Sequence, residues 1–378
     1  DFSRSRGLGD VYKRQIFCQD KDPSKEQWEG NRMGPSNCRK IGAKFGFPIE
    51  AFSEEISKFL INKERIYFQK NLNKILEDEV NKNITSLKKT TSRTNHFIPE
   101  EVHSIDLLLH EIRLIKTKEE IKTIKEACEI SSAAHIRAMK NVCPKMYEYQ
   151  LEAEYVHEFM KKGARNCAYP SIVGGGKNAC ILHYSDNKDL LMDGDLVLVD
   201  AGCEFNGYAS DITRTFPVNG KFSRAQQAVY EIVLDANIEC IKTVKKGLTP
   251  NETEKKAIEV ITQGLIDLKI LNGEINELIE NGAYRDFYMH RVGHWMGMDV
   301  HDVGSYGKNG NWRKYLPGMI TTIEPGIYFK EDLKNVPQEY LNIGIRIEDD
   351  VLVTEGDPEV LTSSVPKTIK DIEKLMSS

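Results

Sequence analysis

Two aspartates bracket a predicted β-hairpin near the middle of the chain, and they restrict the fold more than any other feature. Residues 195–200 read Asp-Leu-Val-Leu-Val-Asp, which predicts a buried strand, and residues 207–216 predict its antiparallel partner. A hairpin centred at 205–206 would place Asp200 directly opposite Asp211. Carboxylates that face each other on paired strands repel unless a cation lies between them. Because Asp200 follows four apolar residues, the pattern favours a buried cation site over two exposed strand-end charges.

Two glutamates end further strand-like runs and extend this pattern. Glu324 closes the run 320–323, just before a Pro-Gly pair. Within residues 343–348, strict alternation places three isoleucines on one face and Arg346 and Glu348 on the other. Each of these charges alone could be a solvated group at a strand end. Four carboxylates at the ends of buried strands, however, cannot stay buried without partners, and two divalent cations would cancel their charge.

Residues 287–302 contribute imidazoles to the predicted site. They hold three of the nine histidines, His290, His294 and His301, among glycines and apolar residues. The spacing of His290 and His294 resembles a His-x-x-x-His metal pair on a helix, although two glycines weaken any helix there. Oxygen-rich ligation that includes imidazole suits manganese, and also cobalt, zinc or iron. A carboxylate-bridged pair of such ions activates water in hydrolysis.

The rest of the sequence is interpreted as a tail followed by two domains. Residues 1–15 are interpreted as a non-native tail that carries no function. Residues 16–104 predict a small, incomplete α/β domain, and residues 105–378 predict a larger α+β domain, because helices and strands occur there in separate blocks. Helices are predicted at 52–60, 71–76, 107–114, 118–139, 148–162, 224–245 and 252–268. Besides the hairpin, strands are predicted at 16–18, 66–69, 319–324, 342–348 and 351–354.

Composition and charge argue against several classes of partner. The net charge of −5 and the pI near 6.1 give no basic footprint for nucleic acid. No apolar run is long enough to span a membrane, and no signal-peptide pattern opens the chain. The eight cysteines are scattered without a Cys-x-x-Cys pair, which fits reduced thiols in a cytoplasm. We therefore expect a cytoplasmic protein that binds neither nucleic acid nor membranes.

The charged motifs occur in an order that resembles the aminopeptidase P family of pita-bread metallopeptidases. The resemblance covers about residues 16–376 and rests on five motifs: Asp200-Ala201-Gly202, Asp211-Ile212-Thr213-Arg214-Thr215-Phe216-Pro217, His294-Trp295-Met296-Gly297 with Asp299-Val300-His301-Asp302, Thr322-Ile323-Glu324-Pro325-Gly326, and Arg346-Ile347-Glu348-Asp349. It implies a pita-bread C-terminal domain and a smaller creatinase-type N-terminal domain that lacks its first strands in this chain.

The resemblance also implies which residues hold metal. The family's ligands fall on Asp200, Asp211, His294, Glu324 and Glu348, with Asp211 and Glu348 bridging two divalent ions. Of the two histidines that spacing alone would pair, only His294 would then bind metal. Manganese is the expected metal, with cobalt, zinc or iron as alternatives.

The implied reaction removes the N-terminal residue from peptides with proline in the second position. A hydroxide activated by the two metals would attack the carbonyl of the X-Pro bond, with Glu324 as the proton shuttle. The family's substrate and transition-state histidines fall on His183, His290 and His301. Arg346 is expected to help hold the proline side of the substrate.

Trp28 and the histidine spacing favour aminopeptidase P over its relatives. Trp28 resembles an N-domain tryptophan that reaches a neighbouring subunit's site, so a homo-oligomer, either a dimer or a tetramer, is expected. A prolidase, which cuts only dipeptides, shares all five ligands and is the main alternative. A methionine aminopeptidase usually lacks the N-terminal domain. A non-catalytic pita-bread binding protein or a metal-free creatinase is expected to lose ligands that this chain keeps.

Overall fold

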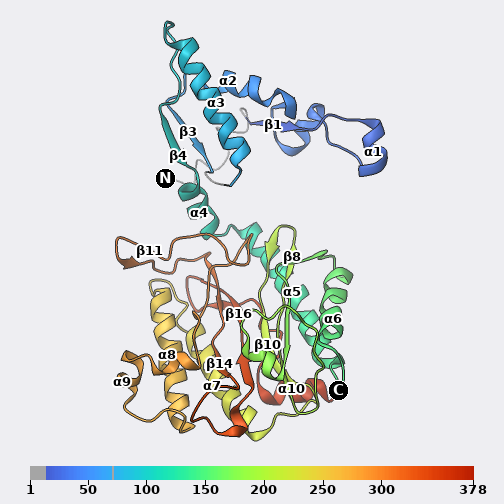
Figure 1. Cartoon of the computed structure of the whole chain (residues 1–378), viewed down its shortest axis with the longest axis vertical. Helices are drawn as coiled ribbons and strands as arrows, with labels where there is room; N and C mark the ends of the chain where they lie inside the picture. Colours follow the sequence, from blue (N-terminus) through green and yellow to red (C-terminus); the bar gives the residue numbers. More distant parts are fainter. Residues whose placement is uncertain (1–13, 70–71) are drawn as a thin grey trace. The chain divides into compact units, whose positions relative to one another are not determined.

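The structure is a computed structural model that describes residues 14–69 and 72–378 (Figure 1). It contains two units, of which the first ends at Leu109 and the second begins at His110. Most of the predicted tail, residues 1–15, lies outside the described residues. In the described part of the chain, no helix is both long enough and apolar enough to cross a membrane.

The first unit combines parallel strand pairs with helices. Its elements are β1 (Gln15–Cys18), α1 (Pro23–Glu29), η2 (Pro35–Ile41), β2 (Phe45–Pro48), η3 (Ile49–Ala51), α2 (Phe52–Leu60), β3 (Arg65–Phe68), α3 (Lys74–Thr91) and β4 (Glu101–Ser104). Strand β1 pairs with β2, and β3 pairs with β4, both in parallel. Helix α3 begins after Asn73, whose side chain accepts the N–H of Leu76. The helix predicted at 71–76 is shorter than α3. The buried side chains of α3 lie within a lysine-rich sequence, which obscures their helical spacing.

Helix α4 (Asp106–Leu114) spans the boundary between the two units, and the second unit contains the helices and strands that follow it. These are α5 (Lys118–Asn141), α6 (Glu148–Lys161), β5 (Asn166–Cys167), β6 (Ile172–Gly175), η4 (Gly176–Cys180), β7 (Leu196–Asp200), β8 (Cys203–Phe205), β9 (Tyr208–Ala209), β10 (Thr213–Pro217), α7 (Arg224–Ile241), α8 (Pro250–Asp267), α9 (Ile275–Glu280), η5 (Ala283–Asp286), β11 (Gly307–Lys308), β12 (Asn311–Trp312), β13 (Ile320–Ile323), β14 (Gly326–Phe329), η6 (Gln338–Tyr340), β15 (Ile343–Arg346), β16 (Asp349–Leu352), β17 (Glu359–Val360) and α10 (Ile369–Met376). Helix α5 starts where predicted because Thr117 and Glu120 form a reciprocal cap.

Strands of the second unit lie between two packed helix pairs, α5 with α6 and α7 with α8 (Figure 1). Strand β7 pairs with β6 on one side and β10 on the other, all antiparallel. Strand β13 pairs with β16, and β14 pairs with β15. Three predicted acidic ligands lie where these strands end: Asp200 closes β7, Glu324 follows β13, and Glu348 lies between β15 and β16.

The register of the central hairpin differs from the prediction. Asp200 pairs with Thr213, and not with Asp211. The turn residues Asn206 and Gly207 both have positive φ, at 52° and 83°, as a type I′ turn requires. The turn therefore centres at 206–207, one position later than expected, and Asp211 falls in the irregular segment before β10.

Strand β14 was not predicted, because the Pro325-Gly326 pair at its start reads as a turn. It pairs with β15, and Tyr328 lies opposite Gly344. Gly344 has a packing reason to be glycine, since a Cβ there would lie 2.3 Å from the carbonyl oxygen of Ala179. The face of β15 that carries Arg346 is buried as well, which the alternation of the sequence did not indicate.

A buried ion pair joins β10 to the start of β16. The Arg214 guanidinium donates to Asp349 Oδ1 over 2.7 Å and to the carbonyl of Glu348 over 2.6 Å. Lys367 Nζ donates to Asp349 Oδ2 over 2.7 Å. Although burial opposes it, these two cations hold the pKa of the Asp349 carboxyl below its usual value. The pair thereby fixes the backbone of Glu348 against β10.

Replacing Arg214 with methionine is expected to lower the free energy of unfolding by about 3–5 kcal/mol, because it leaves a buried carboxylate with only one cation. Urea denaturation of the purified variant measures this. Lys221→Met is the control, since it removes an ion pair with Glu373 from a lysine that is 71% exposed. That loss should stay below about 1 kcal/mol. Equal losses in both variants would contradict a structural role for the buried pair.

Candidate active site

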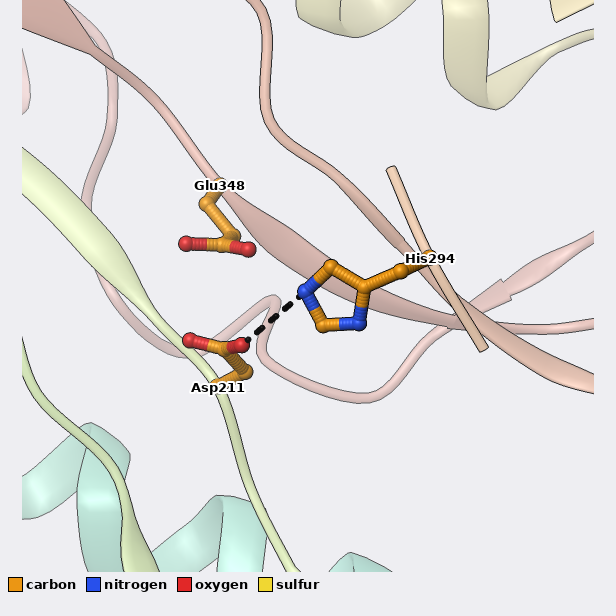
Figure 2. Close-up of side chains that lie close together, drawn as sticks. All are labelled: Asp211, His294 and Glu348. Atoms are coloured by element: carbon orange, nitrogen blue, oxygen red, sulfur yellow. Dashed lines mark ion pairs between the residues drawn. The ribbon is translucent and has the colours of Figure 1, made fainter. Parts of the chain in front are cut away.

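Asp211, His294 and Glu348 lie together at the centre of the candidate site (Figure 2). One oxygen or nitrogen atom from each lies within 4.8 Å of the other two, and His294 Nε2 is 3.4 Å from Asp211 Oδ2. His294 belongs to an irregular segment and not to a helix. Its N–H donates to Thr322 Oγ1 over 3.0 Å, and the N–H of Thr322 donates to its carbonyl over 2.9 Å. These bonds tie His294 to strand β13.

Tyr169 joins Asp200 to this cluster. Its hydroxyl lies 2.6 Å from Asp200 Oδ1 and 2.6 Å from Asp211 Oδ1. The hydroxyl has a single hydrogen to donate, so it can satisfy only one carboxylate at a time. The second close contact therefore requires a proton on a carboxyl group or a nearby cation. The two aspartates thus share one site even though they are not paired across the hairpin.

Glu324 lies on the histidine side of the cluster. Its Oε1 is 3.6 Å from His294 Nε2, and its Oε2 is 3.9 Å from His290 Nδ1. Thr322 Oγ1 donates weakly to Glu324 Oε1 over 3.5 Å. All five predicted ligands line one cavity with a volume of about 720 Å³: Asp200, Asp211, His294, Glu324 and Glu348.

The pKa values of these groups reflect an excess of buried negative charge. Burial raises the pKa of Asp211, and neighbouring Asp200 raises it further. Burial and then repulsion from Asp211 raise the pKa of Glu348 well above its usual value. Burial raises the pKa of Glu324 to about 7. Although burial opposes it, Asp211 and Glu324 raise the pKa of His294 to about 9. These raised carboxyl pKa values indicate that the buried negative charge lacks a cation, so the donor set of carboxylates and one imidazole fits divalent metal.

The predicted substrate-side residues also line the cavity: His183, His290, His301 and Arg346. The ring of His301 packs edge-on against that of His294, with centroids 4.2 Å apart. His290 Nε2 is 2.8 Å from the hydroxyl of Tyr328, and burial lowers its pKa to about 4, which leaves its ring neutral near pH 7. Trp28 lies in helix α1 of the first unit and is 87% exposed.

Arg346 is held by protein groups. Its Nη2 donates to Asp200 Oδ2 over 2.7 Å, its Nη1 to the Tyr328 hydroxyl over 3.0 Å, and its Nε to Thr213 Oγ1 over 3.1 Å. Thr213 in turn donates to Glu348 Oε2 over 2.6 Å. These bonds connect two predicted ligands, Asp200 and Glu348, through one buried guanidinium. The geometry therefore favours a role in positioning ligands over direct contact with substrate.

Sequence reasoning missed Tyr169, Tyr328 and Asp350. Asp350 Oδ2 accepts the N–H of Asp211 over 3.0 Å and fixes its backbone. Nothing around Tyr169 in the sequence distinguishes it from an ordinary loop aromatic. Tyr328 could have been found by extending strand alternation past Pro325-Gly326. Asp350 could have been suspected as the last of three consecutive acids that begin with Glu348.

The chain is similar to known metallopeptidases over most of its length. Residues 122–355 match the model of metallopeptidase family M24. The Xaa-Pro aminopeptidase of Haemophilus influenzae is 44% identical over 368 residues, which cover 97% of this chain and 82% of that protein. The chain belongs to the Xaa-Pro aminopeptidases of metallopeptidase family M24. The family predicted from the motifs is thereby confirmed.

Solved structures of aminopeptidases match 96% of the chain. Aminopeptidase PepP of Pseudomonas aeruginosa has a TM-score of 0.94 and 46% identity, covering 96% of this chain and 82% of that one. A glutamate-to-alanine variant of Escherichia coli aminopeptidase P in complex with substrate has a TM-score of 0.93 and 41% identity, with coverage of 96% and 82%. The predicted α+β pita-bread fold, with its N-terminal α/β region, is confirmed.

Proposed function

We propose that this chain hydrolyses the bond between the first residue of a peptide and a proline in the second position. The observation that carries the proposal is the cluster of buried Asp211, half-buried His294 and buried Glu348 in the wall of a large cavity. Membership of the Xaa-Pro aminopeptidases supports the choice of bond. Such a bond needs its own recognition, because the proline nitrogen has no hydrogen to donate.

The proposed cofactor is a pair of divalent metal ions, with manganese favoured over cobalt, zinc or iron. The residues that would hold them are Asp200, Asp211, His294, Glu324 and Glu348, which line one cavity. When bound, the ions would lower the pKa of a water molecule and polarise the scissile carbonyl. The support is the oxygen-rich donor set and its excess negative charge.

The remaining roles follow from where the side chains lie in the cavity. Glu324 accepts a proton from the attacking water and passes it to the departing proline nitrogen. His183 and His301 donate hydrogen bonds to the substrate backbone or to charge that develops on the carbonyl oxygen. His290, neutral and bonded to Tyr328, faces the proline side. Arg346 holds Asp200 in place.

Assembly and location are also part of the proposal. We infer a homo-oligomer, a dimer or a tetramer, in which Trp28 reaches the site of a neighbouring subunit. Its 87% exposure leaves the indole ring available for such a contact. A cytoplasmic location agrees with the state of the cysteines, because all eight are free.

A peptide panel tests the proposed bond specificity. With manganese added, X-Pro-Y tripeptides should be cleaved after the first residue, whereas X-Ala-Y tripeptides and X-Pro dipeptides should not. Product formation is followed by chromatography, with a chelator-treated sample as the control. Cleavage of dipeptides alone would identify a prolidase instead. A purified protein that binds no metal and cleaves no peptide would favour a binding protein.

A further inference from the structure

Arg291 is a cation in the cavity wall whose guanidinium forms no ion pair within the described part of the chain. Burial raises the pKa of Glu254 in the same wall, and the Arg291 charge partly offsets this rise, so these two residues interact beyond ion-pair distance. Arg291 lines the same cavity of about 720 Å³ as His294 and Glu324. Its guanidinium carbon lies 5.7 Å from the centre of the Trp312 ring, which fits a cation–π contact. Among residues 14–69 and 72–378, none forms an ion pair or a hydrogen bond with this guanidinium.

The other charges that line the cavity make Arg291 distinctive. The lining acids are Asp200, Asp211, Glu254, Glu324 and Glu348. Arg346 also lines the cavity, but its guanidinium is already bonded to Asp200, Tyr328 and Thr213. The proposed metal ions would neutralise four of these acids, which leaves Glu254 as the acid that opposes an anionic part of a substrate. Arg291 offers such a group a positive charge that no ion pair or hydrogen bond occupies in the described part of the chain.

Local structure places Arg291 beside the reacting groups and limits its movement. It directly follows His290, whose Nδ1 is 2.8 Å from the Arg291 carbonyl and 3.9 Å from Glu324 Oε2. Trp312 comes from strand β12 and is 41% exposed, so the stacked pair lies at the open side of the cavity. A cation–π contact does not use the N–H donors of a guanidinium, so they remain available for two parallel hydrogen bonds, the geometry that a carboxylate accepts.

We propose that Arg291, held against Trp312, binds a carboxylate of the peptide that lies beyond the proline. Two sources share this chemistry: the C-terminal carboxylate of a short peptide, and an acidic side chain after the proline. The inference rests on the proposed function and adds a preference among its substrates. It predicts that anionic peptides bind more tightly, so that the preference is expressed in KM.

Paired peptides separate the two sources. One pair is X-Pro-Ala with a free C-terminus and its C-terminal amide; the other is X-Pro-Glu-amide and X-Pro-Gln-amide. The kcat and KM values are measured for the parent chain and for Arg291→Gln, Arg291→Lys and Trp312→Leu. Arg285→Gln is the matched control, because Arg285 also packs on an aromatic ring, 6.0 Å from the centre of Tyr284, but does not line the cavity.

For the parent chain, the acidic member of at least one pair should have a KM about tenfold lower than its neutral partner, as for a hydrogen bond between charged groups. Arg291→Gln should remove that ratio, Arg291→Lys should retain part of it, and Arg285→Gln should leave it unchanged. The pair that responds identifies the source of the carboxylate. A ratio near one in the parent chain, or an unchanged ratio in Arg291→Gln, would overturn the inference. The neutral peptides report separately on the proposed function, since their cleavage does not need the carboxylate.

Discussion

Glu324→Gln is expected to lower kcat on an X-Pro-Y peptide by about 10²–10⁴-fold, the usual contribution of a general acid–base group. Glutamine has nearly the same shape and can keep the contact with Thr322, but it cannot take up a proton. The carboxylate lies 3.6 Å from His294 and 3.9 Å from His290, where an attacking water and a leaving nitrogen would both be in reach. Steady-state kinetics with manganese, together with the metal content of the variant, measure the effect.

Glu254→Gln is a matched control for that experiment. Glu254 lines the same cavity, but its Oε2 accepts the N–H of Val292 over 2.8 Å, and a glutamine oxygen can accept the same bond. This variant should keep most of the parent kcat. Parent-like turnover in Glu324→Gln with metal bound would contradict the shuttle role. Loss of metal from Glu324→Gln would instead assign the residue's main contribution to ligation.

Two acids of the candidate site, Asp200 and Glu324, could be predicted because each one ends a buried strand. Asp200 closes β7 and Glu324 follows β13, and neither strand has an exposed face that would explain a charge. The hydrophobic pattern therefore indicates both the buried strand and the unexpected charged residue at its end. The resemblance in motif order then selected His294 over the His290–His294 pair, which spacing alone favoured. His294 lies in an irregular segment, where helical spacing carries no information.

The contacts between these residues could not be predicted because they depend on register and on long-range packing. One position in the Asn-Gly turn decided whether Asp200 faces Asp211 or Thr213. Tyr169 bridges two aspartates from a loop with no charge pattern of its own. Arg346 reads as the polar face of a strand, yet it is buried, because its partners come from segments remote in the sequence. The local sequence pattern indicates which residues are unusual, whereas tertiary packing determines which residues they contact.

Asp211→Asn is expected to abolish the stabilisation that added metal gives the parent chain. A free metal concentration about a thousand times its Kd would stabilise the parent by about 4 kcal/mol. The variant removes a carboxylate from the middle of the donor set but can still accept the Tyr169 hydrogen bond. Thermal melts with chelator and with manganese measure the shift, and peptide cleavage by the variant should fall with it.

In chelator at pH 7, Asp211→Asn should be at least as stable as the parent. Burial and Asp200 raise the pKa of Asp211 in the folded state above its unfolded value of 3.8. An acid whose pKa is raised by folding destabilises the fold above its unfolded pKa and has no effect below it, where both states are protonated. The advantage of the asparagine variant should therefore shrink as the pH is lowered towards 4. Melts at several pH values in chelator test this.

Asp195→Asn provides the comparison for both parts of this prediction. Asp195 immediately precedes β7, at the opposite end of the strand that Asp200 closes, and burial also raises its pKa. Its substitution should leave the response to metal unchanged, because Asp195 does not line the cavity. If Asp211→Asn kept the parent's metal response, Asp211 would not be a ligand. If Asp211→Asn were less stable than the parent in chelator at pH 7, the Asp211 carboxylate would stabilise the metal-free fold. The excess of buried negative charge would then not explain why the site needs a metal.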